Sequence, residues 1–97
     1  MSVRHLLNGI NTLKVSGDLD IAITGIKYDS RKVTPGDVFV CIKGFKSDGH
    51  EYAEDAIAKG ASAVVVEQDI PIQEGITKLL VDNTRRTLGV FARNFYG

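Results

Sequence analysis

The sequence has few of the residues on which small stapled or metal-bound domains depend. Its 97 residues include one cysteine, Cys41, two histidines, His5 and His50, and no tryptophan. A single cysteine excludes an internal disulfide framework, and this content of Cys and His is too small for a cysteine-rich structural zinc site. Stability must therefore come from one hydrophobic core, of the modest size that a chain of this length can form.

Net charge and long apolar runs are also lacking. Twelve Lys and Arg residues balance twelve Asp and Glu residues, whereas a domain that holds nucleic-acid backbone usually carries a clear positive excess. The longest apolar runs, such as residues 61–66, are far shorter than the roughly 20 residues that cross a membrane. The start of the chain has no apolar region typical of a signal peptide. Neither a nucleic acid nor a membrane is an expected partner, and the expected location is cytoplasmic.

Motifs for nucleotide phosphates and for metals are missing as well. The sequence contains neither G-x-x-x-x-G-K-[ST] nor G-x-G-x-x-G, and no pair of histidines at helical spacing. We therefore predict no catalytic residue and no metal ligand. Cys41 lies in the most apolar segment, which favours a buried, inert thiol over a nucleophile. His50 is interpreted as a residue of a first helical turn, exposed or capping, in preference to a catalytic role.

The pattern that is present indicates one α/β domain over residues 1–97. Hydrophobic residues make up 43% and charged residues 25%, as in ordinary globular proteins. Periodicity predicts helices at residues 3–10, 47–60 and 83–97, and strands at residues 11–19, 21–30, 37–44, 61–68 and 76–82. A strand, a helix and a strand in close succession predict a crossover between parallel strands. The expected fold is a single small α/β domain with a mixed or mostly parallel sheet flanked by helices.

Local signals fix several details of this prediction. Pro35-Gly36 is typical of positions i+1 and i+2 of a turn. Asp48 is a candidate N-cap, with Glu51 at the spacing of a capping box, and Gly60 is a candidate left-handed C′ residue. Gly25 predicts a bulge within the strand over residues 21–30. The continuously apolar residues 38–42 predict a strand buried on both faces, in the middle of the sheet.

Positive charge is concentrated in residues 27–47. Five Lys and Arg residues stand there against Asp29 and Asp37, so the segment sums to +3 and the rest of the chain to −3. These charges lie in the loops at the two ends of the predicted strand over residues 37–44. Ligands of α/β sheets bind at loops beyond strand ends, and an anionic small molecule suits such a patch. An ordinary solvated surface remains the alternative.

The side chains of these two loops suit a planar ring and a diphosphate. The Ser30 hydroxyl both donates and accepts hydrogen bonds, and Phe45 can stack on a planar ring such as uracil. Arg31, Lys32 or Lys46 can bind a diphosphate. The alternatives are that Asp29 and Ser30 only cap a turn, and that Phe45 only anchors its loop.

The longest ordered motif, residues 23–67, resembles the N-terminal domain of the Mur ligases that extend the peptidoglycan stem peptide. It reads DSRKVTPGDVFV, then KG, DGH and a helix ending in AIAKGA. The tail VDNTRRTLGVFARNFYG is similar to the end of that domain. Two types of Mur ligase share the domain: one adds the third stem residue and the other adds D-Ala-D-Ala. The motif YDSRKV and the C-terminal motif of the chain are more similar to the first type.

The resemblance implies that this domain holds the UDP part of UDP-N-acetylmuramoyl-L-Ala-D-Glu. It implies that Ser30 contacts the nucleotide and that Tyr28 lines the site. Residues Phe45, Lys46 and Ser47 match the opposite wall, while Asp48 and Gly49 are assigned to helix capping. With Arg31 as a candidate for the diphosphate, the predicted substrate-binding residues are Tyr28, Ser30, Arg31, Phe45, Lys46 and Ser47.

The resemblance also implies what the intact enzyme does. ATP, with Mg²⁺, phosphorylates the terminal carboxylate of the substrate, and the amine of the incoming amino acid attacks the acyl phosphate. Residues 1–97 are expected to bind no cofactor themselves, to be inactive alone, and to contact the central ATP-binding domain, which this sequence lacks together with the C-terminal domain. A stand-alone interaction module, using the apolar face from Leu88 to Phe95, is the alternative from another functional class.

Overall fold

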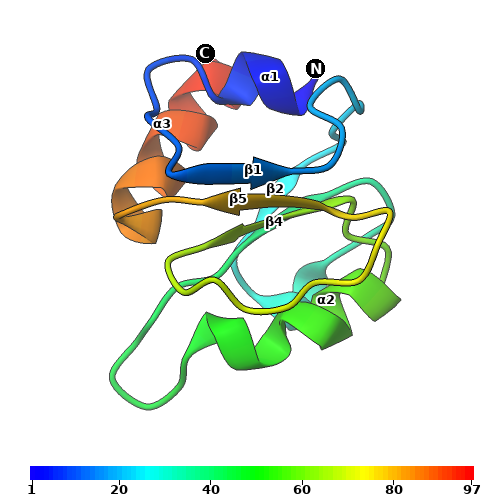
Figure 1. The fold of residues 1–97 in the computed structure, drawn as a ribbon, viewed down its shortest axis with the longest axis vertical. Helices are drawn as coiled ribbons and strands as arrows, with labels where there is room; N and C mark the ends of the chain where they lie inside the picture. The colour runs from blue at the N-terminus through cyan, green and yellow to red at the C-terminus, as the bar shows by residue number, and fades with distance from the viewer.

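The computed structural model describes residues 1–97 as a five-stranded sheet between two layers of helices (Figure 1). The strand order is β1-β5-β4-β3-β2. Strands β2 to β5 pair in parallel, and β1 joins the edge antiparallel to β5, so the predicted mixed, mostly parallel sheet is confirmed. The elements are α1 (Val3–Leu6), β1 (Lys14–Ser16), β2 (Ile26–Lys27), 3-10 helix η1 (Ser30–Lys32), β3 (Val38–Val40), 3-10 helix η2 (Gly49–Tyr52), α2 (Ala53–Ala58), β4 (Ala63–Val66), β5 (Thr77–Leu80) and α3 (Thr84–Tyr96).

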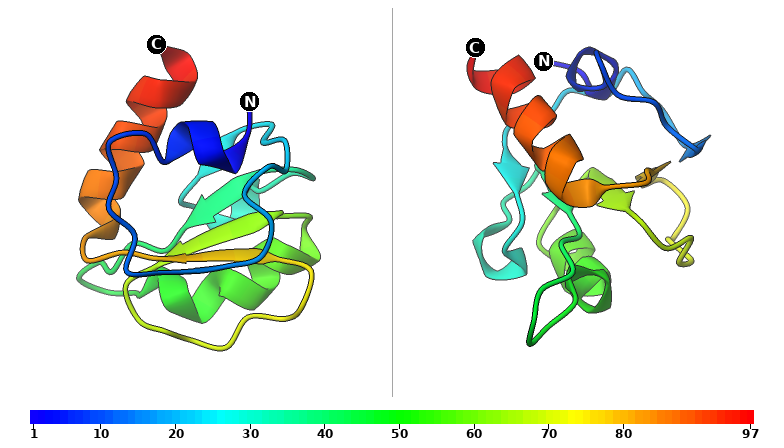
Figure 2. Two further views of the ribbon diagram at one scale, coloured as in Figure 1. Left: turned by 45° about the horizontal axis from the view of Figure 1, so that its top comes forward. Right: turned by 90° about the vertical axis from the view of Figure 1, so that its left-hand side faces the viewer.

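Each face of the sheet forms its own hydrophobic core. Side chains alternate along a strand, so Val38 and Val40 of β3 point to one face and Phe39 points to the other. The first face is covered by α1 and α3, which contribute Leu6 and Phe91. The second is covered by α2, as the views in Figure 2 show. Both faces of β3 and β4 are therefore buried, as their apolar sequence predicts.

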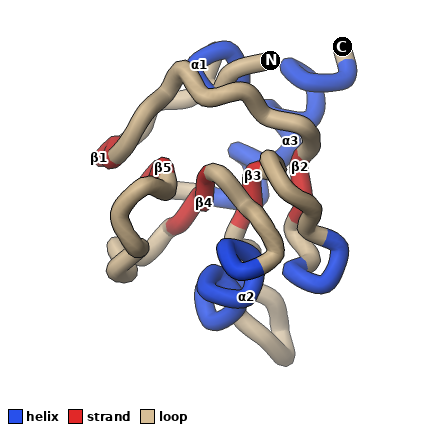
Figure 3. The backbone as a smooth tube through the Cα atoms, turned by 90° about the vertical axis from the view of Figure 1, so that its right-hand side faces the viewer, coloured by secondary structure: helices blue, strands red, loops and turns tan.

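Strand β3 lies inside the sheet, between β2 and β4, while β4 is the middle strand (Figure 3). The helix predicted over residues 47–60 is shorter and begins as the 3-10 turn η2. Asp48 caps that turn by accepting the backbone N–H of His50, and Glu51 does not complete a capping box. Gly60 ends α2 with φ +108°. The N–H groups of Gly60 and Ala61 bond to the carbonyls of Ile57 and Ala56, which is a Schellman motif.

The predicted strand over residues 21–30 is largely wrong. Only Ile26 and Lys27 join the sheet, and Ala22 forms an isolated antiparallel bridge with Ser2. Gly25 is not a bulge within a ladder, but the place where the chain passes the buried side chain of Asp37. A Cβ atom at Gly25 would lie 2.9 Å from Asp37 Oδ1, so the absence of a side chain permits this approach.

Helix α3 returns the chain to its start. Its buried residue Phe91 enters the first core, with Leu88 and Phe95 beside it. The Asn94 side chain donates to the carbonyls of Leu6 and Asn8, each at 2.9 Å, so the two termini lie near one another (Figure 2). None of the helices has the length and apolar character needed to cross a membrane.

Candidate functional site

A cavity lies where β2 and β3 end. Since these strands are parallel neighbours, the segments that follow them emerge at the same edge of the sheet, where ligands of α/β folds bind. The cavity has a volume of about 420 Å³, within the range of small-molecule sites. Its lining combines four polar or charged side chains with aromatic and aliphatic ones: Tyr28, Asp29, Ser30, Arg31, Phe39, Ile42, Ser47, Gly49 and Tyr52.

Ser30 is held in the cavity lining by the 3-10 turn η1. Asp29 caps this turn, accepting the backbone N–H of Arg31 at 3.0 Å. The Lys59 ammonium, from the end of α2, donates to the Ser30 carbonyl at 3.2 Å. Ser30 is only 8% exposed, yet the side-chain hydrogen bonds of the structure leave its hydroxyl unengaged, and no fully buried polar atom lacks a partner. This hydroxyl is therefore available to a molecule in the cavity.

Arg31 enters the cavity wall as half of an ion pair. Its Nε and one terminal nitrogen donate to the two carboxylate oxygens of Asp29 at 3.0 and 2.9 Å. The side-chain and backbone hydrogen bonds from Arg31 lower the pKa of Asp29 to about 2, so the carboxylate stays charged at neutral pH. The positive charge of Arg31 is thus largely balanced, and a ligand anion would compete with Asp29 for it.

Aromatic rings border the cavity. Tyr28 is 64% exposed and Tyr52 is 40% exposed, and both belong to the lining. The sequence analysis identified Tyr28 as a site residue but missed Tyr52. The signal was present, because Tyr52 directly follows the DGHE turn that brings the chain back past the end of β3.

The loop of residues 43–48 forms the other side of the cavity, but not through all of its predicted residues. Ser47 lies in the lining, whereas Phe45 and Lys46 do not. The loop closes through a Lys43–Asp48 bridge and a hydrogen bond from Gly44 N–H to the Ser47 carbonyl at 2.8 Å. Phe45 lies fully exposed on this loop, which extends away from the sheet at the lower left of Figure 1. The alternative of Phe45 as a loop anchor is therefore wrong.

The positive patch is partly neutralised within the fold. Lys27 binds Asp37 at 3.0 Å, and Arg31 binds Asp29. The remaining cations of the segment, Lys32, Lys43 and Lys46, take part in none of the ion pairs. Lys32 borders a separate cavity of about 100 Å³.

Cys41 and His50, for which the sequence predicts no catalytic role, are both buried. Cys41 is completely buried, as predicted, and burial raises the pKa of its thiol to about 12, which supports the interpretation as an inert thiol. His50 is not an exposed residue: its side chain is 3% exposed and hydrogen-bonded at both ring nitrogens. No group of three or more His, Cys, Asp or Glu side chains is placed to hold a metal ion.

The sequence profile of the Mur ligase family, described as its catalytic domain, matches residues 22–96. The chain belongs to the Mur ligase family. Among curated relatives, it is 49% identical over 96 residues to the UDP-N-acetylmuramoyl-L-alanyl-D-glutamate–2,6-diaminopimelate ligase of Clostridioides difficile. It is 41% identical over 97 residues to the enzyme of the same name from Clostridium perfringens.

The alignments to these two ligases cover 99% and 100% of the chain and 20% of each relative. The chain therefore spans about a fifth of the length of the curated relatives that it matches.

Solved Mur ligases share the fold. The structure is similar to that of MurF from Acinetobacter baumannii, with a TM-score of 0.77 and 28% identity, covering 96% of this chain and 20% of that one. MurF of Thermotoga maritima, solved in complex with ADP, matches with a TM-score of 0.62 and 32% identity over 75% of this chain and 16% of that one. The predicted family and fold are thus confirmed. The sequence identity to the diaminopimelate ligases is higher than the sequence identity to the MurF structures.

Proposed function

We propose that residues 1–97 bind the UDP part of UDP-N-acetylmuramoyl-L-Ala-D-Glu as the N-terminal domain of a ligase that adds the third residue of the peptidoglycan stem peptide. The observation that carries this proposal is the cavity at the ends of β2 and β3. Its volume of about 420 Å³ suits a nucleoside with part of its diphosphate. Its free Ser30 hydroxyl and its tyrosine rings match a planar base with hydrogen-bonding edges.

The names of the relatives support the choice of ligase type. Those at 41–49% identity are called diaminopimelate ligases, and the structural neighbours at 27–32% identity are MurF enzymes. We therefore take 2,6-diaminopimelate as the proposed third residue. The D-Ala-D-Ala-adding type remains the second candidate, because its solved members share the fold over 96% of this chain.

In the proposed enzyme, which would work in the cytoplasm, the chain supplies binding and orientation. ATP and Mg²⁺ would phosphorylate the substrate carboxylate, but residues 1–97 contain neither a phosphate loop nor a suitable cluster of metal ligands. We assign that chemistry to the central domain, against which this domain would lie. Binding energy from the remote UDP group then positions the reacting carboxylate.

The stand-alone interaction module is disfavoured by the packing of α3. Its residues Leu88, Phe91 and Phe95 contact the core of this same chain. That apolar face is consequently not free for a partner.

The experiment is a titration of the ¹⁵N-labelled chain with UDP-N-acetylmuramoyl-L-Ala-D-Glu. We expect shifts of the amide signals of Ser30, Arg31 and Ser47, and weaker shifts with ADP, whose larger base differs at the hydrogen-bonding edge. N-acetylmuramoyl-L-Ala-D-Glu without UDP is the control and should leave these signals in place. Absence of shifts at millimolar UDP-linked substrate, or equal shifts with the control, contradicts the proposal.

A further inference from the structure

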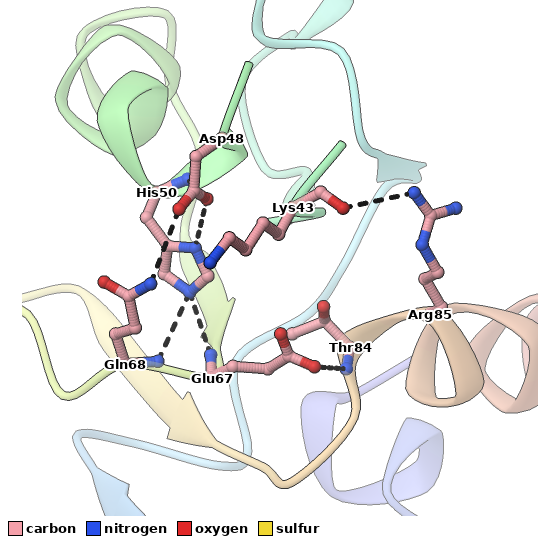
Figure 4. Close-up of polar contacts among 7 residues, drawn as sticks. All are labelled: Lys43, Asp48, His50, Glu67, Gln68, Thr84 and Arg85. Carbon is pink, nitrogen blue, oxygen red and sulfur yellow. Dashed lines mark hydrogen bonds and ion pairs between the residues drawn. The ribbon is translucent and has the colours of Figure 1, made fainter. Parts of the chain in front are cut away.

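His50 connects the loop of residues 43–48, called the cavity loop below, to the end of strand β4. Its Nδ1 lies 2.6 Å from Asp48 Oδ1, while its Nε2 lies 2.9 Å from the backbone nitrogen of Glu67 and 3.3 Å from that of Gln68 (Figure 4). The imidazole side chain is 3% exposed. All of its polar contacts are therefore made within the protein, and they connect segments 17 and 18 residues apart.

These contacts define the protonation state of the ring. The backbone N–H groups of Glu67 and Gln68 can only donate, so Nε2 must accept. The carboxylate of Asp48 can only accept, so Nδ1 must carry the proton. The neutral Nδ1–H tautomer satisfies every partner, whereas a proton on Nε2 would face two N–H donors. The ring therefore accepts hydrogen bonds from the backbone at the end of β4 and donates one to the carboxylate of Asp48.

The same network reaches helix α3. The Glu67 carboxylate accepts the backbone N–H of Thr84, in the first turn of α3, at 3.0 Å. Arg85, one residue further on, donates to the Lys43 carbonyl at 3.2 Å. The base of the cavity loop is thus bound to the end of β4 by one route and to the start of α3 by another, as Figure 4 shows.

Asp48, the residue that His50 holds, lies between two residues of the cavity lining. Ser47 precedes it and Gly49 follows it. Gly49 is pressed against the end of β3, because a Cβ atom there would lie 2.6 Å from the nitrogen of Ile42. A displacement of Asp48 would therefore move the Ser47 side of the cavity and leave the Ser30 side, in a different loop, where it is.

We propose that His50 is a positioning residue for the nucleotide site: in its neutral Nδ1–H form it fixes the loop of residues 43–48 through Asp48 and so sets the width of the cavity. This inference rests on the proposed function, since it identifies the cavity with the UDP site. It adds a role for a residue that is not part of the cavity lining. Removal of the Nε2 acceptor should free the loop, because two inward-facing N–H groups would then lack their partner.

Two substitutions separate the two ends of the bridge. His50→Gln offers a carbonyl oxygen near the position of Nε2, and His50→Asn offers an N–H near the position of Nδ1. Both remove the ring, so both should lower the melting temperature. In both, the backbone N–H of residue 50 still donates to Asp48, so Asp48 stays attached to residue 50, and only His50→Asn loses the link to the backbone of Glu67 and Gln68. We expect UDP to bind His50→Gln within about threefold of the original affinity and to bind His50→Asn about tenfold more weakly, as the loss of one well-placed acceptor implies. His5→Asn, the same change at an exposed histidine, is the control.

Two measurements without ligand keep this test independent of the proposed function. The ¹⁵N spectrum of the His50 ring should show the neutral Nδ1–H tautomer. Exchange of the Gly44 amide, which closes the loop, should be at least about tenfold faster in His50→Asn than in the original chain, and nearly unchanged in His50→Gln. An Nε2–H tautomer, or equal exchange in all variants, overturns the positioning role. Failure of the original chain to bind UDP while these two results hold contradicts only the proposed function.

Discussion

Asp37 lies at the opposite end of β3 from the cavity. Removal of its charge tests how strongly its hydrogen bonds stabilise the fold. Asp37 is 1% exposed and accepts four hydrogen bonds. They come from the Thr34 backbone at 2.8 Å, the Thr24 hydroxyl at 2.9 Å, the Lys27 ammonium at 3.0 Å and the Thr34 hydroxyl at 3.0 Å. The carboxylate thereby holds the turn before β3 to the segment that leads into β2. Asp37→Asn keeps the shape and removes the charge.

The expected loss of stability follows from these contacts. Breaking a buried ion pair by removing one partner costs about 3–5 kcal/mol, but Lys27 is 31% exposed and can recover hydration in the variant. The new amide nitrogen would also face donors. We therefore expect a loss of about 3 kcal/mol, which lowers the melting temperature of a domain of this size by roughly 12–24 °C. The variant should still fold at 25 °C, because small domains are stable by about 5–15 kcal/mol.

The difference in stability between the original chain and Asp37→Asn should become smaller as the pH falls. Burial tends to raise the pKa of Asp37, but the hydrogen bonds from Thr34, Lys27 and Thr24 outweigh it and lower the pKa below the ordinary value. A lowered pKa contributes stability that is present in full above the unfolded-state pKa of about 3.9 and is lost as the pH falls through the folded-state value. The gap between the original chain and Asp37→Asn should accordingly be constant from pH 6 to 8 and shrink in acid (roughly below pH 4).

Urea unfolding at several pH values, followed by circular dichroism, measures this gap. Asp82→Asn, at an exposed carboxylate, is the matched control and should cost less than about 0.5 kcal/mol. A cost for Asp37→Asn of under about 1 kcal/mol would refute the reasoning, and so would a gap that does not narrow on acidification. The folded variant should retain the UDP affinity of the original chain, since Asp37 lies outside the cavity.

Three further outcomes are expected. Ser30→Ala should weaken UDP binding by roughly three- to tenfold with almost no change in melting temperature, because its hydroxyl bonds to no protein group; a large thermal shift would favour the turn-capping alternative. Gly60→Ala should destabilise the chain by more than about 2 kcal/mol, since its φ is +108° and its Cβ would lie 2.6 Å from Pro35, while Gly75→Ala, at φ +90° with open space, should cost about 1 kcal/mol. Cys41 should resist alkylation at pH 8 in the native chain and react after unfolding, because its pKa is raised to about 12.

Those parts of the fold that depend on local chemistry could be predicted from the sequence. The apolar run from Val38 to Ile42 identified a strand buried on both faces, because only such a strand is apolar at successive positions. Gly60 identified the end of α2, because a left-handed C′ residue has a strong preference for glycine. The strand predicted through Gly25 failed because what decides its course is the approach to Asp37, twelve residues away.

The candidate site was predictable only in part, for a related reason. Tyr28, Ser30 and Arg31 belong to one short segment, so a single motif marked them together, and all three line the cavity. The burial of His50 had no local signal, since its partners Glu67 and Gln68 become neighbours only when β4 takes its place beside β3. A histidine after a D-G turn is equally compatible with an exposed first turn.

The structure also shows which positive charges of the segment around β3 are not paired with carboxylates. Arg31 and Lys27 are each paired with a carboxylate, so the unpaired charge of the segment lies on Lys32, Lys43 and Lys46. Two of these three belong to the loop of residues 43–48, while Lys32 faces a different cavity. A diphosphate would therefore be attracted from the loop side, and its attraction should weaken with added salt. The position of that loop, which the buried histidine holds, matters because the loop carries most of the charge that is free to act on a ligand.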